Sequence, residues 1–180
     1  MEGFINFSLA KESMMRMSNL LAAVSFPLCC LTQSPAVQAA PVDDPVPFKK
    51  ENVYGGWSKD LFADAAVVQG PHKTIYVAGM ASENPESGRI DHLGDFSAQC
   101  AMAYGKIRKI LVEQGADMNS IVRTVAYVTD MRYFNQYMAC QKDALGGAAL
   151  PPHTMLNVNR LAWPGMMVEV EVTAVVPEKR

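Results

Sequence analysis

The chain is poor in the residues that bind metals or form crosslinks. Its 180 residues include only four cysteines and three histidines. His72, His92 and His153 lie far apart, and no histidine or cysteine pair has the spacing of a zinc site. We therefore expect no metal. A domain of this length also needs no disulfide framework to bury a core.

Clusters of positive charge are lacking as well. The formal net charge is −2, from 16 Lys and Arg against 18 Asp and Glu, and the cations are scattered along the chain. Nothing marks a surface for nucleic acid or for an anionic membrane, so a small neutral or anionic molecule is the better candidate partner. The sequence also has no Gly-rich phosphate loop and no serine nucleophile elbow, and we expect no cofactor.

The apolar run Leu20–Leu31 is too short to span a bilayer. Lys11 and Arg16 precede it, and the small-residue pattern Val37–Ala39 follows it. This arrangement predicts a signal peptide over residues 1–39 and export of the mature chain to the periplasm. No membrane contact is expected after cleavage. The alternative is a disordered tail with an apolar patch, which would leave the protein in the cytoplasm.

Cys100 and Cys140 are the cysteines that remain after such a cleavage. They could pair in an oxidising compartment. Both, however, lie on apolar helical stripes, where free cysteine behaves as a small hydrophobic residue. We therefore expect two buried free thiols.

Residue spacing predicts a single domain after an extended N-terminal segment, residues 40–64, that is rich in Pro, Asp, Lys and Gly. Order is expected to begin near Ala65. The predicted strands are residues 65–69, 74–78, 121–129, 154–159 and 167–176, and the predicted helices are residues 96–114 and 131–145. The order is ββαβαββ, and residues 70–73 are expected to join the first two strands as a hairpin.

Two helices can cover only one face of such a sheet. Alternation places Arg123, Val125 and Tyr127 together on one face of their strand, and Glu169 and Glu171 together on one face of the last strand. This second face is too mixed for bare surface and too polar for a core. We therefore expect oligomerisation around it, with a site shared between subunits. A monomeric ferredoxin-like plait is the rival fold, but its βαββαβ order does not accommodate the predicted hairpin.

A series of markers runs along residues 65–177: Gly79, Asn84-Pro85 with Gly88, Asp95 to Gln99, Val122-Arg123-Thr124-Val125 with Val128-Thr129-Asp130, Pro151-Pro152-His153, and Val168-Glu169-Val170-Glu171. In their order and spacing these markers resemble the Rid family, also called YjgF, the reactive-intermediate deaminases.

The resemblance implies a chorismate-mutase-like α+β fold and a homotrimer, with the open sheet faces forming a barrel and ligand clefts between neighbouring chains. It also implies hydrolysis of small enamines and imines, such as 2-aminoacrylate, to keto acids and ammonia without a metal or cofactor. In this family an arginine holds the substrate carboxylate and a glutamate positions the water.

Carried over to this chain, the resemblance predicts Glu169 as the catalytic residue and Gly79 as part of the cleft. His153 stands in the position of the family's arginine. A neutral imidazole offers one donor where a guanidinium offers a charged fork, so we expect a substrate other than 2-aminoacrylate. Tyr127 and Arg123 share a strand face and are predicted, with His153, to contact substrate.

Each site residue also has a structural interpretation. His153 could be satisfied by backbone groups at a strand start, and Glu169 could be solvated or paired with Arg123. Arg160 could supply the missing anchor. At the level of function, the alternative to an imine or enamine hydrolase is a non-catalytic trimer that binds a small metabolite in the same cleft.

Overall fold

The computed structural model describes residues 46–178. The predicted signal peptide, residues 1–39, lies outside this part of the chain. In the described part, no helix combines the length and the apolar character needed to cross a membrane.

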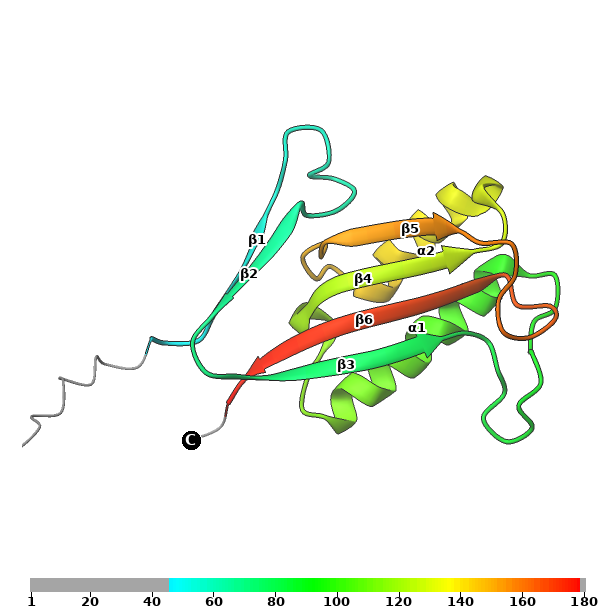
Figure 1. Cartoon of the computed structure of the whole chain (residues 1–180), viewed down its shortest axis with the longest axis horizontal. Helices are drawn as coiled ribbons and strands as arrows, with labels where there is room; N and C mark the ends of the chain where they lie inside the picture. Colours follow the sequence, from blue (N-terminus) through cyan, green and yellow to red (C-terminus); the bar gives the residue numbers. More distant parts are fainter. Residues whose placement is uncertain (1–45, 179–180) are drawn as a thin grey trace, which may run out of the picture. The chain divides into compact units, whose positions relative to one another are not determined.

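Four strands form the main sheet, in the order β3-β6-β4-β5 (Figure 1). They are β3 (His72–Met80), β4 (Ile121–Val128), β5 (His153–Asn157) and β6 (Val168–Pro177). β6 pairs antiparallel with both β3 and β4, whereas β5 runs parallel to β4. The predicted α+β class is thereby confirmed, and these strands lie close to their predicted positions.

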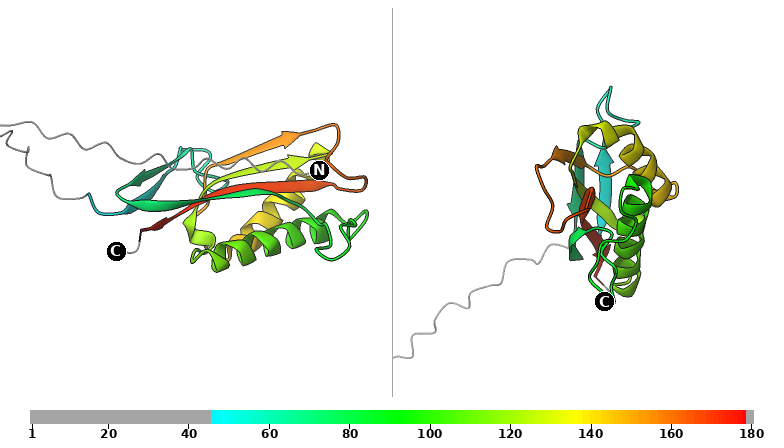
Figure 2. Two further views of the ribbon diagram at one scale, coloured as in Figure 1. Left: turned by 60° about the horizontal axis from the view of Figure 1, so that its bottom comes forward. Right: turned by 90° about the vertical axis from the view of Figure 1, so that its right-hand side faces the viewer.

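Both helices, α1 (Phe96–Glu113) and α2 (Phe134–Leu145), cover the same face of this sheet (Figure 2). Single 3₁₀ turns, η1 (Met118–Ser120) and η2 (Met131–Tyr133), precede β4 and α2. The Asp95 side chain caps α1 by accepting a hydrogen bond from the backbone N–H of Ala98 at 3.0 Å. The predicted apolar stripe of α1 is buried, at Phe96, Cys100, Ala103, Tyr104, Ile107 and Leu111.

The N-terminal part of the described chain differs from the prediction. β1 (Lys49–Val53) pairs with β2 (Ala65–Gln69) in a separate two-stranded sheet. Order therefore begins before Ala65, and the hairpin predicted between residues 65–69 and 74–78 is wrong. The physical reason is core burial: by pairing with β6, β3 places Ile75 and Val77 in the core under the helices, whereas β2 is half exposed.

The KKENV sequence of β1 showed no apolar alternation, and side-chain hydrogen bonds attach it to the rest of the domain. Lys50 donates to the carbonyls of Asn119 and Ile121. Asn52 donates to the carbonyl of Leu150 at 3.0 Å. Polar contacts of this kind leave no periodic pattern in a sequence.

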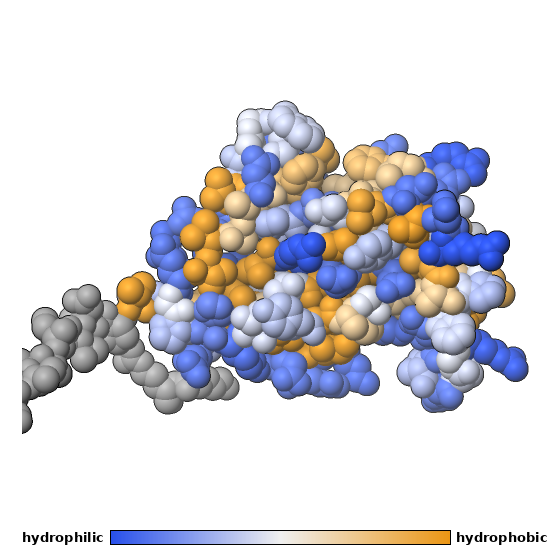
Figure 3. Space-filling view, in the orientation of Figure 1, coloured by the Kyte–Doolittle hydropathy of each residue, from blue (hydrophilic) through white to orange (hydrophobic). Residues whose placement is uncertain are grey.

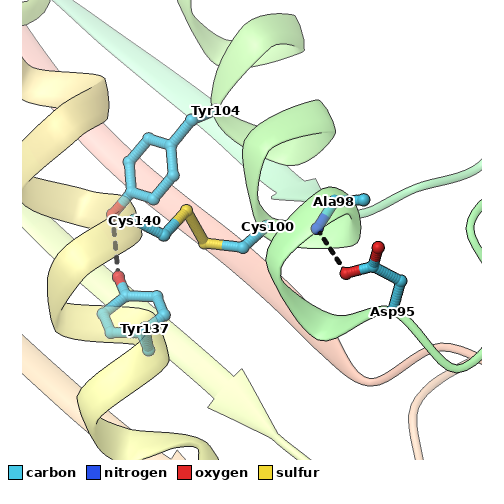
Figure 4. The surroundings of a disulfide bond; sticks show 6 residues. All are labelled: Asp95, Ala98, Cys100, Tyr104, Tyr137 and Cys140. Atoms are coloured by element: carbon cyan, nitrogen blue, oxygen red, sulfur yellow. Dashed lines mark hydrogen bonds between the residues drawn. A yellow bond between two sulfur atoms is a disulfide. The ribbon is translucent and has the colours of Figure 1, made fainter.

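A disulfide joins Cys100 on α1 to Cys140 on α2, with a Cα–Cα distance of 6.4 Å (Figure 4). The expectation of two free thiols is wrong. Each cysteine does lie on a helical stripe, as predicted, but the two stripes face each other across the helix pair, within disulfide reach. Beside the disulfide, the hydroxyls of Tyr104 and Tyr137 form a hydrogen bond at 2.8 Å.

Candidate functional site

The helix-free face of the sheet carries the acidic and aromatic side chains that the sequence placed together. The pairing of β4 with β6 sets Tyr127 beside Glu169, Val125 beside Glu171 and Arg123 beside Thr173. Figure 3 shows this face, on which polar and apolar residues are interspersed. The face also exposes Tyr76 of β3, at 81 % of its surface. The predicted mixed character of the face is what the structure shows.

The Glu169 carboxylate lies directly over Gly79 of β3. A Cβ atom added at Gly79 would be 1.8 Å from Oε1 of Glu169 and 2.8 Å from its Cγ. Any side chain at residue 79 would therefore displace the carboxylate. The structure thus brings together two of the predicted site residues, and glycine is needed for this close approach.

Burial raises the pKa of Glu169, and the negative charges of Glu83 and Glu171 raise it further. Among the described residues, no ion pair or hydrogen bond to this carboxylate is present. Glu169 is therefore a half-buried carboxylate that no cation neutralises. A carboxylate in this state is a stronger base than an ordinary surface glutamate.

Glu171, by contrast, has partners. Its Oε1 is 3.6 Å from Nη1 of Arg123, and its Oε2 accepts a hydrogen bond from the Tyr127 hydroxyl at 3.3 Å. Burial and the nearby carboxylates raise the pKa of Tyr127, so its hydroxyl stays protonated at neutral pH. On this face Arg123 is thus paired with Glu171 and not with Glu169.

The His153 ring lies on the opposite, helix-covered face. β5 pairs with β4 so that His153 is beside the buried Thr124, and the ring stacks on Tyr137 of α2, with 5.2 Å between centroids. Its Nε2 is buried without a hydrogen-bond partner. The chain therefore does not bring the His153 ring and the Glu169 carboxylate together.

Burial lowers the pKa of His153 to about 4, from the usual 6.5. Between these values the unfolded chain binds more protons than the folded one, so stability falls as the pH drops from 6.5 to 4. Because the ring is partly accessible, we expect a loss of about 2 kcal/mol from this group. His153→Phe should remove that loss while retaining the stacking on Tyr137.

Urea unfolding at pH 7 and at pH 4 measures this effect. The matched control is His72→Phe, at an exposed position, which should keep the pH dependence of the wild type. Equal acid sensitivity in the wild type and His153→Phe would contradict the burial of an uncharged imidazole here.

A hollow of about 390 Å³ lies where β2, β4 and β5 come close. Arg123 and His153 both line it, together with Thr154 and Asp64. Arg123, at the edge of this hollow, is four residues before Tyr127 on β4, and Tyr127 is the residue beside Glu169. The predicted site residues thus divide into two groups, with Glu169 and Gly79 in one and Arg123 and His153 in the other. Tyr127 lies between them, beside Glu169 and hydrogen-bonded to Glu171, the partner of Arg123. Arg160 lines a different hollow, beside Trp163.

One residue near Glu169 was not predicted from the sequence: Glu83, which follows β3 and forms an ion pair with Lys106 of α1 at 2.7 Å. Glu83 stands in a loop with no motif that points to it. Only the close approach of this loop to β6 reveals its effect on Glu169. The described residues contain no group of three or more His, Cys, Asp or Glu side chains arranged to hold a metal ion.

The fold and the face together define a class: a two-layer α+β protein with helices on one side of its sheet and an acid-bearing, helix-free face on the other. The model of the family described as Endoribonuclease L-PSP matches residues 62–176. The chain belongs to this family, which is the Rid/YjgF family that the sequence markers resemble, so the resemblance is confirmed.

Relatives support the same assignment. A RutC family protein of Pyrococcus abyssi is 30 % identical over 100 residues, which cover 56 % of this chain and 76 % of that protein. A 2-iminobutanoate/2-iminopropanoate deaminase of Mus musculus is 30 % identical over 103 residues, covering 57 % of this chain and 74 % of the mouse protein.

Solved structures show the same fold. A Rid family protein of Yersinia pestis, of unknown function, superposes with a TM-score of 0.64 at 23 % identity, covering 73 % of this chain and all of the other. A member of the YjgF/YER057c/UK114 family from Mycobacterium tuberculosis gives a TM-score of 0.50 at 27 % identity, covering 71 % of this chain and all of the other.

Proposed function

We propose that this protein hydrolyses small reactive imines or enamines to a carbonyl product and ammonia, at a cleft between subunits. The observation that carries the proposal is the Glu169 carboxylate, half buried, without a cationic partner and packed over Gly79 on the helix-free face. The similarity to a protein named as an imine deaminase supports the choice of reaction.

In this reaction Glu169 accepts a proton from a water molecule as the water oxygen attacks the carbon of a protonated imine. The resulting carbinolamine has a hydroxyl and an amino group on one carbon. Transfer of the proton from Glu169 to the amino nitrogen makes that nitrogen a leaving group. As the C–N bond breaks and the C=O bond forms, the hydroxyl proton passes through the Glu169 carboxylate to the departing ammonia. The sum is protonated imine plus water giving carbonyl compound plus ammonium, with the carboxylate regenerated and no change in oxidation state.

An enamine enters the same route after its β-carbon takes up a proton, which converts it to the imine. The Tyr127 hydroxyl, on the strand beside Glu169, donates its proton to Glu171, and its oxygen can accept a hydrogen bond from an N–H or O–H of the substrate on this face. No step requires a metal or a cofactor.

The subunit cleft is proposed because one chain separates the two groups of site residues. Glu169 and Gly79 lie at one end of the open face, and the hollow lined by Arg123 and Thr154 lies toward the other. A neighbouring copy that covered this face would bring the hollow of one chain toward the Glu169 of the next. Three copies around a common axis would also bury Tyr76 and the other exposed side chains of the face.

We expect the chain lacking residues 1–39 to have three times its monomer mass by light scattering coupled to size exclusion. Tyr76→Arg, which places a charge on the proposed interface, should reduce that mass to a single copy. The matched control is Val112→Arg on α1, a residue that is 63 % exposed and lies on the helix layer. A wild-type mass of one copy would refute the shared cleft.

The second candidate is a non-catalytic trimer that binds a small metabolite. One observation favours it: Arg123, the cation lining the hollow, is already paired with Glu171. A substrate carboxylate would have to compete with that pairing. Ligand-induced thermal shifts without any release of ammonia from freshly generated imines would support this candidate over the enzyme.

A further inference from the structure

An ion pair joins the segment that follows β3 to α1. Nζ of Lys106, on α1, is 2.7 Å from Oε2 of Glu83 and donates a second hydrogen bond, also of 2.7 Å, to the carbonyl of Ala81. The same Glu83 oxygen accepts a hydrogen bond from the backbone N–H of Ala81 at 3.3 Å. Both charged side chains are mostly buried, at 23 % and 28 % exposure. Two hydrogen bonds from Lys106 thus hold the chain that leaves β3 against α1, and the third links Ala81 to Glu83 within that segment.

The segment held in this way supports Glu169. Ala81 is two residues after Gly79, and Gly79 is the surface on which the Glu169 carboxylate rests. The contact is close enough that Gly79 has no room for a methyl group. A displacement of Ala81 would therefore move the backbone under the carboxylate.

Glu83 also acts on Glu169 through its charge. The charged and titratable groups around Glu169 are Glu83 from the segment after β3, Glu171 from β6 and Tyr127 from β4, with Arg123 farther along β4 and Lys106 behind Glu83. The negative charge of Glu83 raises the pKa of Glu169. Lys106 offsets part of this charge because it contacts Glu83 directly.

We propose that the ion pair of Glu83 and Lys106 positions Glu169 and regulates how readily that carboxylate gives up its proton. The inference rests on the proposed function, in which Glu169 is the base. Glu83 and Lys106 are positioning residues, because they act on the reaction through Glu169 and do not touch the substrate.

The two charges act in opposite directions, which separates this role from a purely structural one. Glu83→Gln removes a negative charge and should lower the pH midpoint of Glu169 titration. Lys106→Met leaves Glu83 uncompensated and should raise the midpoint. We expect each change to be about half a pH unit. Loosening of the fold would move both variants in the same direction.

The measurement is an NMR titration of the Glu169 side-chain carboxyl in the wild type and in both variants. Lys106→Arg keeps the positive charge and should restore the wild-type midpoint. If Lys106→Met does not fold, Glu83→Gln combined with Lys106→Gln keeps a hydrogen-bonded pair without charge and should lower the midpoint, since Glu83 is the nearer group. Unchanged midpoints, or shifts of the same sign in both single variants, would overturn the proposal.

The titration does not depend on turnover. The proposed role of the ion pair and the proposed hydrolase function can therefore be refuted independently. Where activity is present, the acid limb of the pH–rate profile should move with the titration midpoint in Glu83→Gln and Lys106→Met. Opposite midpoint shifts with full activity in Glu169→Gln would refute Glu169 as the base while leaving its electrostatic coupling to the ion pair established.

Discussion

Glu169→Gln is expected to lower kcat/KM for imine hydrolysis by about 100-fold to 10,000-fold, the range that general bases contribute. The amide has nearly the shape of the carboxylate, so it fits over Gly79, but it cannot accept a proton from water. Ammonia release from imines generated in the assay measures the effect. The circular dichroism spectrum should match that of the wild type.

Glu171→Gln is the matched control for this prediction. It makes the same chemical change two residues along the same strand, at the carboxylate that is already paired with Arg123. Its loss of activity should be much smaller than that of Glu169→Gln. Equal turnover in the wild type and Glu169→Gln would show that another group activates the water.

The pH dependence of the wild type follows from the same environment. Burial and the charges of Glu83 and Glu171 raise the pKa of Glu169, and the base must be deprotonated to act. Activity should therefore rise with pH through a midpoint above that of an ordinary glutamate. In Glu171→Gln, where one of the two negative charges is gone, the same rise should occur at a lower pH.

Loss of the Cys100–Cys140 disulfide is expected to lower the free energy of unfolding by about 4 kcal/mol. Without the crosslink the unfolded chain gains the entropy that a closed loop of this length denies it. The two cysteines are 40 residues apart in sequence. Urea unfolding of Cys100→Ser, with and without a dithiol reductant, measures the effect. The expected stability order is oxidised wild type, then reduced wild type and Cys100→Ser at about the same lower value.

The variant carries its own control, because the reductant should not change the stability of Cys100→Ser. An oxidised wild type that was no more stable than its reduced form would contradict the crosslink as a source of stability. The disulfide lies between the helices and away from the open face. Its reduction should therefore affect stability more than the site chemistry.

Much of this protein follows from local patterns in its sequence. The three- and four-residue spacing of apolar side chains predicted α1, and Asp95 predicted its first residue. Strand alternation placed Tyr127 and Glu169 on a face that two helices cannot cover. These features depend on residues close together in the chain, so the spacing of apolar residues in a helix or a strand predicts them directly.

The tertiary structure decided the features that depend on the choice of partner. β3 pairs with β6 because its apolar residues then enter the core, and β2 is left to pair with β1. The register of β5 against β4 turns the His153 ring toward Tyr137, away from Glu169. Cys100 and Cys140 form a disulfide because α1 and α2 pack with these two residues facing each other. In each case the stabilising contacts are between segments that are distant in sequence. A local sequence pattern does not indicate which distant segments pack together.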